Sequence, residues 1–433
     1  MRPKRLIFES TGHPKLTHYA FRYPAKFHPP IARALLDSYT SAGDTVLDPF
    51  CGSGTLLVEA LTRDRHSIGV DIDPVAAFVA RAKVHAYSIR RLERLAETLE
   101  AELAPLRRPT KEYERRQFTD LAAHKYAEEL EADGLVPPPL PNLRHWFRKY
   151  VTVDLCRIRA AIDSLRCSRG DRDFFLLVFC SIIRSASNAD PVPVSGLEVT
   201  HHMKKRDAAG RIIDPYGLFF RAVQKATDGV RELAKHRTEC DVEVVQGSAT
   251  ELSTVVKSKA DAVITSPPYH NAVDYYRRHT LESYWLALAT SHEERLVLRR
   301  RYLGQARVRQ DDVFLKRDLF PGTVVRRWEA RMRKVSAERA NAFHHYVNSM
   351  RGVFKELAGR LGTAAPAVFV VGHSTWNSSQ LPTTTIFREI AEPWFSLREL
   401  CWYPISNRYM SYSRRNGANI DREYVLVFER ERQ

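Results

Sequence analysis

The 433-residue chain carries two blocks in which short apolar runs alternate with amphipathic stretches, and a long region of purely helical periodicity separates them. In the first block, a helical pattern at residues 31–39 is followed by an apolar strand at 45–47, a helix at about 56–62 and a strand at 67–72. Strands that alternate with helices in this way predict a parallel sheet with helices on its faces. We therefore expect residues 1–88 to begin a doubly wound α/β domain.

The middle of the chain has a helical period throughout. Residues 89–106 repeat Arg, Leu and Glu at helical spacing, which predicts a solvated amphipathic helix, whereas residues 174–185 are apolar on every side and predict a buried helix. The α/β pattern then returns, with strands expected at 242–245, 261–265, 367–371, 397–403 and 424–429 and a helix at about 346–361. This order predicts a helical insertion at 89–238 and a C-terminal part of the α/β domain at 239–433, with a basic insertion at about 286–340.

Composition narrows the class of protein. Hydrophobic residues make up 44% and charged residues 27% of the chain, which excludes a mainly disordered or collagen-like protein. Lys and Arg number 67 against 51 Asp and Glu, a formal net charge of +16. This excess favours a polyanionic partner such as nucleic acid, although a basic surface that only keeps the protein in solution would give the same count. Residues 286–340 hold 14 Lys and Arg against 7 Asp and Glu.

Cysteine usage and the apolar runs indicate where the protein resides. Six cysteines stand far apart and form no CxxC pair, which predicts reduced thiols and no metal site. The N-terminus has no apolar run long enough for a signal peptide, and the most apolar stretch, residues 174–183, is too short to cross a bilayer. We therefore expect a cytoplasmic protein without a membrane partner.

A glycine-rich segment, DPFCGSGT at residues 48–55, follows the first predicted strand and is called the glycine loop below. Glycines at 52 and 54 allow a tight turn that brings backbone N–H groups close to a ligand. The segment lacks the third glycine of a dinucleotide fingerprint and the lysine of a phosphate-binding loop. Asp71 ends the next strand, placed to accept hydrogen bonds from two ribose hydroxyls. Asp48 and Glu59 add negative charge, which suits a cationic ligand better than a phosphate.

A second motif, Thr-Ser-Pro-Pro-Tyr at residues 265–269, follows another predicted strand and is called the proline loop below. Its two prolines fix the backbone and remove N–H donors, which leaves carbonyl groups free to accept hydrogen bonds. Together with the Ser266 hydroxyl, these acceptors are suited to hold an exocyclic amine. The Tyr269 ring is suited to stack on a flat base. A rigid turn with a buried tyrosine is the alternative for this motif taken alone.

Together these motifs resemble the amino-methylating DNA methyltransferases that use S-adenosylmethionine. The glycine loop resembles their methionine-binding loop, residues 69–74 (GVDIDP) their ribose-binding strand end, and residues 265–269 their catalytic tetrapeptide. Residues 23–30 (YPAKFHPP) resemble the motif that closes over the methionine end of the cofactor. The resemblance implies a Rossmann-like methyltransferase sheet of seven strands with an antiparallel terminal strand. The Ser-Pro-Pro-Tyr form is more typical of cytosine-N4 methylation, and Asp-Pro-Pro-Tyr of adenine-N6 methylation.

The resemblance also implies site residues. The catalytic set is Ser266, Pro267, Pro268 and Tyr269. The cofactor-binding set is Lys26, Phe27, His28, Asp48, Pro49, Phe50, Cys51, Gly52, Gly54, Thr55, Asp71, Ile72, Asp73, Ser248 and Ala249. The family often has an acidic residue after the glycine that ends its third strand, where this chain has Gly247-Ser248. Ser248 would then have to meet the adenine amine.

The residues present also restrict the reaction. Methylation of cytosine carbon 5 needs a cysteine nucleophile, normally after proline, and the chain has no Pro-Cys dipeptide. Direct transfer to an exocyclic nitrogen needs only a positioned amine, and a duplex base must be flipped out to reach such a pocket. The resemblance implies DNA as the substrate and a bacterial or archaeal enzyme with a possible partner restriction endonuclease. Adenine N6, an RNA base amine, and a non-catalytic DNA-binding subunit stay open as alternatives.

The expected DNA contacts lie in the basic insertion, in the helical insertion as a candidate recognition lobe, and near the mouth of the pocket. The candidate residues are Arg277, Arg278, Arg326, Arg327, Arg414 and Arg415. Arginine side chains suit contacts with phosphates and guanine edges.

Overall fold

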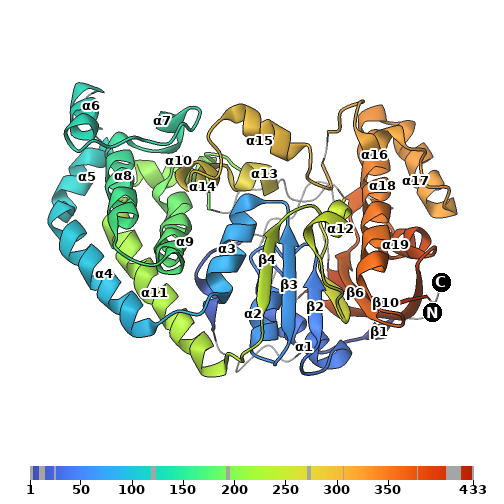
Figure 1. Cartoon of the computed structure of the whole chain (residues 1–433). Helices are drawn as coiled ribbons and strands as arrows, with labels where there is room; N and C mark the ends of the chain where they lie inside the picture. Colours follow the sequence, from blue (N-terminus) through green and yellow to red (C-terminus); the bar gives the residue numbers. More distant parts are fainter. Residues whose placement is uncertain are drawn as a thin grey trace.

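The structure, a computed structural model, describes residues 3–8, 15–23, 26–118, 123–191, 196–270, 275–305, 307–377, 379–405 and 421–431. Figure 1 shows a central sheet with a lobe of helices on one side and the helices of the C-terminal third on the other. Among the described residues, none of the helices combines the length and the apolar character that crossing a bilayer requires.

The central sheet contains eight described strands in the order β1-β9-β10-β6-β5-β2-β3-β4. Their bounds are β1 Lys4–Arg5, β2 Thr45–Asp48, β3 His66–Asp71, β4 Val242–Gln246, β5 Ala262–Thr265, β6 Pro366–Gly372, β9 Phe395–Pro404 and β10 Arg422–Arg430. Neighbouring strands are parallel except at β10, which runs antiparallel to both β6 and β9. The predicted doubly wound sheet with an antiparallel last strand is confirmed, and each of the seven predicted strands is present.

Strand β1 is an addition that the sequence pattern does not predict. It has two exposed residues, and Lys4 pairs with Cys401 of β9 in a parallel register. A strand of two residues is too short to show an alternation of apolar and polar positions. It can therefore be recognised only from its pairing with β9 in the structure.

The two faces of the sheet pack against different helices. Val46 of β2 and Ile264 of β5 belong to an apolar cluster with helices α1 (Pro29–Tyr39) and α2 (Thr55–Leu61). Their neighbours Leu47 and Val263 join the opposite cluster, with helices α18 (Ala337–Arg360) and α19 (Thr383–Ala391). The central strands therefore read as continuous apolar runs, because both faces are covered.

Most of the remaining helices form a lobe, and the others lie around the sheet. The lobe contains α4 (Ile89–Leu103), α5 (Thr110–Phe118), α6 (Ala123–Ala132), α7 (Leu143–Trp146), α8 (Lys149–Ser164), α9 (Arg169–Ala186), α10 (His201–Ala208) and α11 (Pro215–His236). Elsewhere lie α3 (Pro74–Val84), α12 (Leu252–Val255), α13 (Tyr275–Arg278), α14 (Thr280–Trp285), α15 (His292–Arg299), α16 (Val313–Lys316) and α17 (Thr323–Arg333). A small hairpin joins β7 (Thr375–Trp376) to β8 (Ser379–Gln380), and short 3-10 turns occupy Thr17–Tyr19, Ala104–Leu106 and Ala249–Glu251.

The lobe shares its apolar core with the α/β domain. Val75 and Phe78 of α3 and Trp285 of α14 belong to the same cluster as the buried side chains of α8, α9 and α11. The predicted boundaries near residues 88 and 238 therefore stay a prediction, since one apolar core includes residues on both sides of each boundary.

Helix α18 begins earlier than predicted. It starts at Ala337 rather than near residue 346, and its N-cap residue Ser336 accepts a hydrogen bond from the Arg339 N–H. The basic residues just before 346 obscure the helix in a hydropathy pattern, whereas the cap and the burial of Ala340 and Phe343 show why the helix extends.

Candidate active site

A cavity opens at the carboxyl ends of the parallel strands. Residues of both the glycine loop and the proline loop line it. Strand β2 lies between β3 and β5 in the sheet, and the chain continues first toward β3 and β4, then returns to β5 and β6 on the other side. The cavity therefore lies at a topological switch point, where α/β sheets bind ligands.

The glycine loop depends on its two glycines. Gly52 and Gly54 have φ values of 50° and 72°, in the left-handed region that favours glycine. A Cβ on Gly52 would lie 3.1 Å from the Tyr23 ring, and a Cβ on Gly54 would lie 3.0 Å from the Cβ of Ala80. The loop is therefore packed tightly on both sides, with its backbone close to the cavity.

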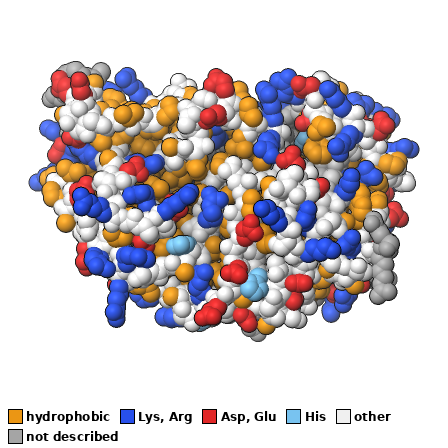
Figure 2. Space-filling view, viewed as in Figure 1, with side chains coloured by type: hydrophobic (Ala, Val, Ile, Leu, Met, Phe, Trp, Pro, Cys, Tyr) orange, Lys and Arg blue, Asp and Glu red, His pale blue; other side chains and the backbone are white. Residues whose placement is uncertain are grey.

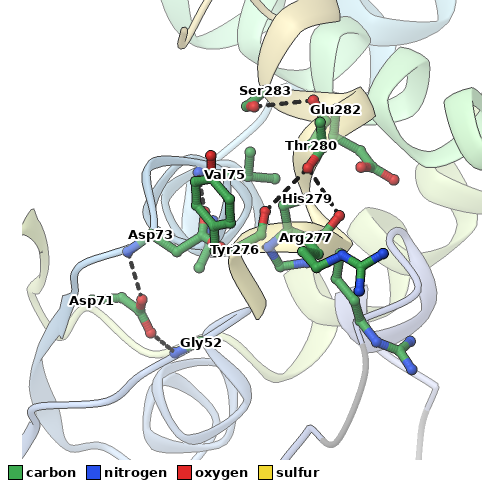
Figure 3. A network of polar contacts seen from close by, with 12 residues as sticks. Gly52, Asp71, Asp73, Val75, Tyr276, Arg277, His279, Thr280, Glu282 and Ser283 are labelled. Atoms are coloured by element: carbon green, nitrogen blue, oxygen red, sulfur yellow. Dashed lines mark hydrogen bonds and ion pairs between the residues drawn. The ribbon is translucent and has the colours of Figure 1, made fainter. Parts of the chain in front are cut away.

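Asp71 joins the glycine loop to the end of β3. Its Oδ2 accepts a hydrogen bond from the Gly52 N–H at 2.8 Å, and its Oδ1 accepts one from the Asp73 N–H at 2.9 Å (Figure 3). Burial, together with the charge of Asp73, raises the pKa of Asp71 to about 7. Each carboxylate oxygen keeps a lone pair for a further donor in the cavity.

Asp48 joins the glycine loop to the proline loop. Its Oδ1 accepts hydrogen bonds from the Thr265 hydroxyl at 2.6 Å and from the Phe50 N–H at 3.2 Å. Burial raises the pKa of Asp48 to about 7. The two loops that the sequence singled out are thus fixed to each other through one side chain.

Glu59 corrects an expectation. It is fully buried on α2 and forms ion pairs with Arg33 at 3.0 Å and Arg63 at 3.1 Å, and its Oε1 lies 2.8 Å from His18 Nε2. It does not line the cavity. The prediction that its charge favours a cationic ligand was wrong, because the helix turns this carboxylate toward partners inside the protein.

Lysines border the loop from two directions. Lys83 of α3 is buried and donates to the Ser53 carbonyl at 2.6 Å, which holds the glycine loop from beneath. Burial lowers the pKa of Lys83 to about 7. Lys26 lines the cavity, donates to the His18 carbonyl at 3.3 Å and lies 4.4 Å from the centre of the Tyr19 ring.

The proline loop is held at both ends. The Pro268 carbonyl accepts a hydrogen bond from the Tyr346 hydroxyl at 3.0 Å, and the Tyr269 hydroxyl donates to Glu423 at 2.7 Å. Ser266 and Pro268 line the cavity, whereas Pro267 and Tyr269 are not among its lining residues. The loop therefore presents Ser266 to the same space that the glycine loop borders.

Most of the predicted cofactor residues meet in this cavity. Those that line it are Lys26, Phe27, Asp48, Pro49, Phe50, Cys51, Gly52, Thr55, Asp71, Ile72, Asp73, Ser248 and Ala249. His28 instead precedes α1 as its N-cap residue, and Gly54 precedes α2 in the same position. The Ser248 hydroxyl lies 2.8 Å from the Thr250 hydroxyl and caps the short turn that follows it.

The structure adds cavity residues that the sequence analysis did not select. They are Tyr23, Ser53, Arg301, Tyr302 and Leu303. Tyr23 begins the motif at residues 23–30, and Ser53 stands inside the glycine loop, so the sequence motifs could have identified both as cavity residues. Residues 301–303 carried no such signal, because they lie inside the basic insertion and far along the chain from every other lining residue.

The predicted DNA-contact residues lie in separate places. Arg326 and Arg327 are exposed on α17, and Arg277 on α13 donates to the Leu197 carbonyl at 3.3 Å. The backbone carbonyl of Arg278, which is partly buried, accepts a hydrogen bond from Arg184. Arg414 and Arg415 lie outside the described residues. Figure 2 shows Lys and Arg side chains gathered over the upper right of the molecule, where α16 and α17 lie.

The sheet order, the glycine loop and the cavity at the switch point define a Rossmann-like methyltransferase fold. The family model described as DNA methylase matches residues 5–80. The resemblance to the amino-methylating DNA methyltransferases is thereby confirmed. In the parts of the chain that the structure describes, no group of His, Cys, Asp and Glu side chains is arranged to hold a metal ion.

Particular relatives extend the similarity. The chain is 24% identical over 291 residues to the Type II methyltransferase M.BsoBI of Geobacillus stearothermophilus, covering 66% of this chain and 55% of that protein. It is 25% identical over 312 residues to the Type II methyltransferase M.MvaI of Kocuria varians, covering 67% and 62%. A 74-residue stretch is 38% identical to the tRNA (guanine(10)-N2)-dimethyltransferase of Methanothermobacter thermautotrophicus, covering 17% and 22%. The chain therefore spans only part of the length of each relative.

Proposed function

We propose that this chain transfers a methyl group from S-adenosylmethionine to the exocyclic N4 amine of a cytosine in DNA. The observation that carries the proposal is that Ser266 lines the same cavity as Gly52 and Asp71. A methyl donor held by the glycine loop and an amine held by the proline loop would then meet in one space, as direct transfer requires.

The chemistry of the cavity fits the cofactor. Asp48, Asp71 and Asp73 line it, and carboxylates suit a sulfonium cation and the hydroxyls of a ribose. The Tyr23 ring packs closely against Gly52 and lines the cavity with it. Lys26 is the cation that would meet the carboxylate of the methionine end.

The proline loop supplies the groups that would orient the amine. When bound, S-adenosylmethionine offers an electrophilic methyl group, and the amine nitrogen forms the new bond while the electron pair of the broken bond stays on sulfur. Ser266 and the Pro267 carbonyl would accept the two amine hydrogens, because the Pro268 carbonyl is already bonded to Tyr346. The Tyr269 ring would lie against the flipped base, and the released proton passes to water.

DNA is the proposed substrate, and a restriction endonuclease the proposed partner. The net charge of +16 and the exposed Arg326 and Arg327 support a polyanion. The two relatives that cover about two thirds of this chain are named as Type II methyltransferases. The tRNA enzyme matches 17% of this chain, a span too short to include both the glycine loop and the proline loop, so it does not bear on the substrate.

The proposal is tested by product analysis. Purified protein is incubated with plasmid DNA from a methylation-deficient host and isotopically labelled S-adenosylmethionine, and the digested nucleosides are analysed by mass spectrometry. We expect labelled N4-methylcytosine from the wild-type chain and about 100-fold less in the same time from Ser266→Ala. Labelled N6-methyladenine would keep the mechanism and overturn the base, whereas label in tRNA but not in DNA would overturn the substrate.

The pKa of Asp71 makes cofactor affinity depend on pH. Since this pKa is about 7, Asp71 is mainly protonated at pH 6 and mainly ionised at pH 8. Only the ionised form accepts from the ribose with both oxygens, so affinity rises with pH. We expect S-adenosylhomocysteine to bind about tenfold more tightly at pH 8 than at pH 6 in calorimetric titrations.

Asp71→Asn is the control for this pH dependence. Its side chain has no charge to lose, so it should bind more weakly at every pH with a nearly flat profile. An unchanged slope in Asp71→Asn would assign the pH dependence to another group, of which Asp48 is the first to test by Asp48→Asn.

A further inference from the structure

The segment 301–304, called the wall segment below, follows α15 inside the basic insertion but borders the cofactor cavity. Arg301, Tyr302 and Leu303 line the cavity beside Asp71 and Asp73. These are the residues for which the sequence offered no signal. The basic insertion therefore has two features: a positively charged surface, and residues that line the proposed cofactor site.

Tyr302 lies at the ribose end of the cavity. Its hydroxyl lies close enough to Asp73 and to the proposed ribose-binding Asp71 for their charges to act on it. Burial, and the negative charges of Asp73 and Asp71, raise the pKa of Tyr302 well above its ordinary value, so the hydroxyl stays a donor. The ring therefore stands beside the position where the adenosine half of the cofactor would lie.

Asp73, which lines the cavity beside Tyr302, is held firmly in place. Its Oδ1 accepts from the Val75 N–H at 2.8 Å at the start of α3, and its Oδ2 lies 2.5 Å from His279 Nδ1 (Figure 3). Although burial alone would raise the pKa of Asp73, its contacts with His279 and with backbone N–H groups hold it below the ordinary value. Asp73 is therefore an ionised acceptor that the surrounding structure cannot easily move.

Local contacts also fix the shape of the wall segment. The Gln305 side-chain amide donates to the Tyr302 carbonyl at 2.7 Å and to the Arg300 carbonyl at 3.1 Å. The Tyr302 ring lies edge-on to the Tyr276 ring, with centroids 6.4 Å apart. The ion pair between Arg301 and Glu251, at 3.0 Å, is exposed and contributes little.

The other end of the wall segment touches the proline loop. Gly304 has a φ of 75°, and a Cβ there would lie 2.9 Å from the Tyr269 carbonyl oxygen. Four consecutive residues thus contact both the ribose end of the cofactor cavity and the backbone of the proline loop.

We propose that the wall segment completes the cofactor site, with Tyr302 packing against the adenosine half of the bound cofactor and Gly304 positioning the proline loop. This inference rests on the proposed function, because it assumes that the cavity binds S-adenosylmethionine. Tyr302 is a cofactor-contact residue, and Gly304 is a positioning residue that acts through Tyr269.

The first test measures the affinity of the full chain for S-adenosylhomocysteine by calorimetry, with thermal unfolding of each variant as a folding check. We expect Tyr302→Ala to weaken binding about tenfold or more, because it removes a ring contact, and Tyr302→Phe to weaken it by a smaller factor, because it keeps the ring and removes only the hydroxyl. Arg300→Ala is the matched control: it alters an exposed neighbour that does not line the cavity, and its affinity should equal that of the wild type.

The outcomes separate this inference from the proposed function. Wild-type protein that binds no S-adenosylhomocysteine would overturn both. Normal wild-type binding with an unchanged affinity in Tyr302→Ala would overturn only the role of Tyr302. Tighter binding in Tyr302→Ala would also overturn that role, because it would show that the ring competes with the cofactor for the cavity.

The second test addresses Gly304. Gly304→Ala places a methyl group against the Tyr269 carbonyl and should lower the turnover number about tenfold or more, while the affinity for S-adenosylhomocysteine stays within about twofold of the wild type. Gly134→Ala is the matched control, because Gly134 has a similar φ of 61° and a Cβ there meets nothing within 4 Å. Loss of affinity and turnover in equal measure, or no loss of either, would overturn the positioning role.

Discussion

Ser266→Ala is expected to lower the turnover number about 100-fold while leaving the affinity for S-adenosylmethionine within about twofold of the wild type. The Ser266 hydroxyl lines the cavity at the end of β5, where it would accept a hydrogen from the target amine and so direct the nitrogen lone pair toward the methyl group. The proposed cofactor contacts lie in the glycine loop, at Lys26 and Asp71, and in the wall segment. Removing one hydroxyl should therefore affect the reaction much more than binding.

Tyr269→Ala should show the same separation. Its ring would lie against the target base, and its hydroxyl is held by Glu423 at 2.7 Å, outside the cofactor contacts. Single-turnover rates and calorimetric affinities measured on both variants test the assignment. An equal loss of cofactor binding in the two variants would contradict it.

Ser374→Ala is a suitable control for these variants. The Ser374 hydroxyl donates to the carbonyl of His270, the residue after the proline loop, at 2.9 Å, and Ser374 does not line the cavity. It removes the same atom from the neighbourhood of the loop without removing a proposed amine contact. Its turnover should stay close to that of the wild type.

Asp71→Ala is expected to have the opposite effect and to weaken cofactor binding about 100-fold or more. The substitution removes the acceptor of the Gly52 and Asp73 N–H groups, and each donor left unsatisfied in a buried place costs about 1–3 kcal/mol. It also removes the carboxylate that would meet the ribose. Because the glycine loop loses its tie to β3, the loss appears in affinity first.

Calorimetric titration with S-adenosylhomocysteine measures this effect. Asp241→Ala is the matched control, because this carboxylate stands just before the neighbouring strand β4 and is 99% exposed. Turnover that falls while the affinity of Asp71→Ala stays normal would contradict the cofactor role of Asp71.

The central strands and the two loops could be predicted because their signals are local. A short apolar run such as Ala262–Thr265, followed by a serine and then two prolines, identifies a buried strand end without knowledge of its neighbours. The glycines at 52 and 54 likewise report a backbone that other residues rarely adopt. Local backbone geometry depends on adjacent residues, so it can be predicted from the sequence without knowing which distant residues come into contact.

Errors arose where a side chain's direction depends on distant partners. Glu59 stands close to the glycine loop in sequence, yet α2 turns it toward Arg33 and Arg63. The start of α18 at Ala337 and the pairing of β1 with β9 also depend on contacts that no local pattern records.

The sequence by itself determined the order of seven of the eight described strands of the central sheet, the tight turn of the glycine loop and the rigid proline loop, because each follows from the conformational preferences of neighbouring residues. The tertiary structure alone decided that Asp48 joins the two loops through Thr265 and that Tyr302 of the basic insertion lines the cavity beside Asp73. These residues lie more than 200 positions apart in each case, and only the packing of the sheet and its helices brings them together.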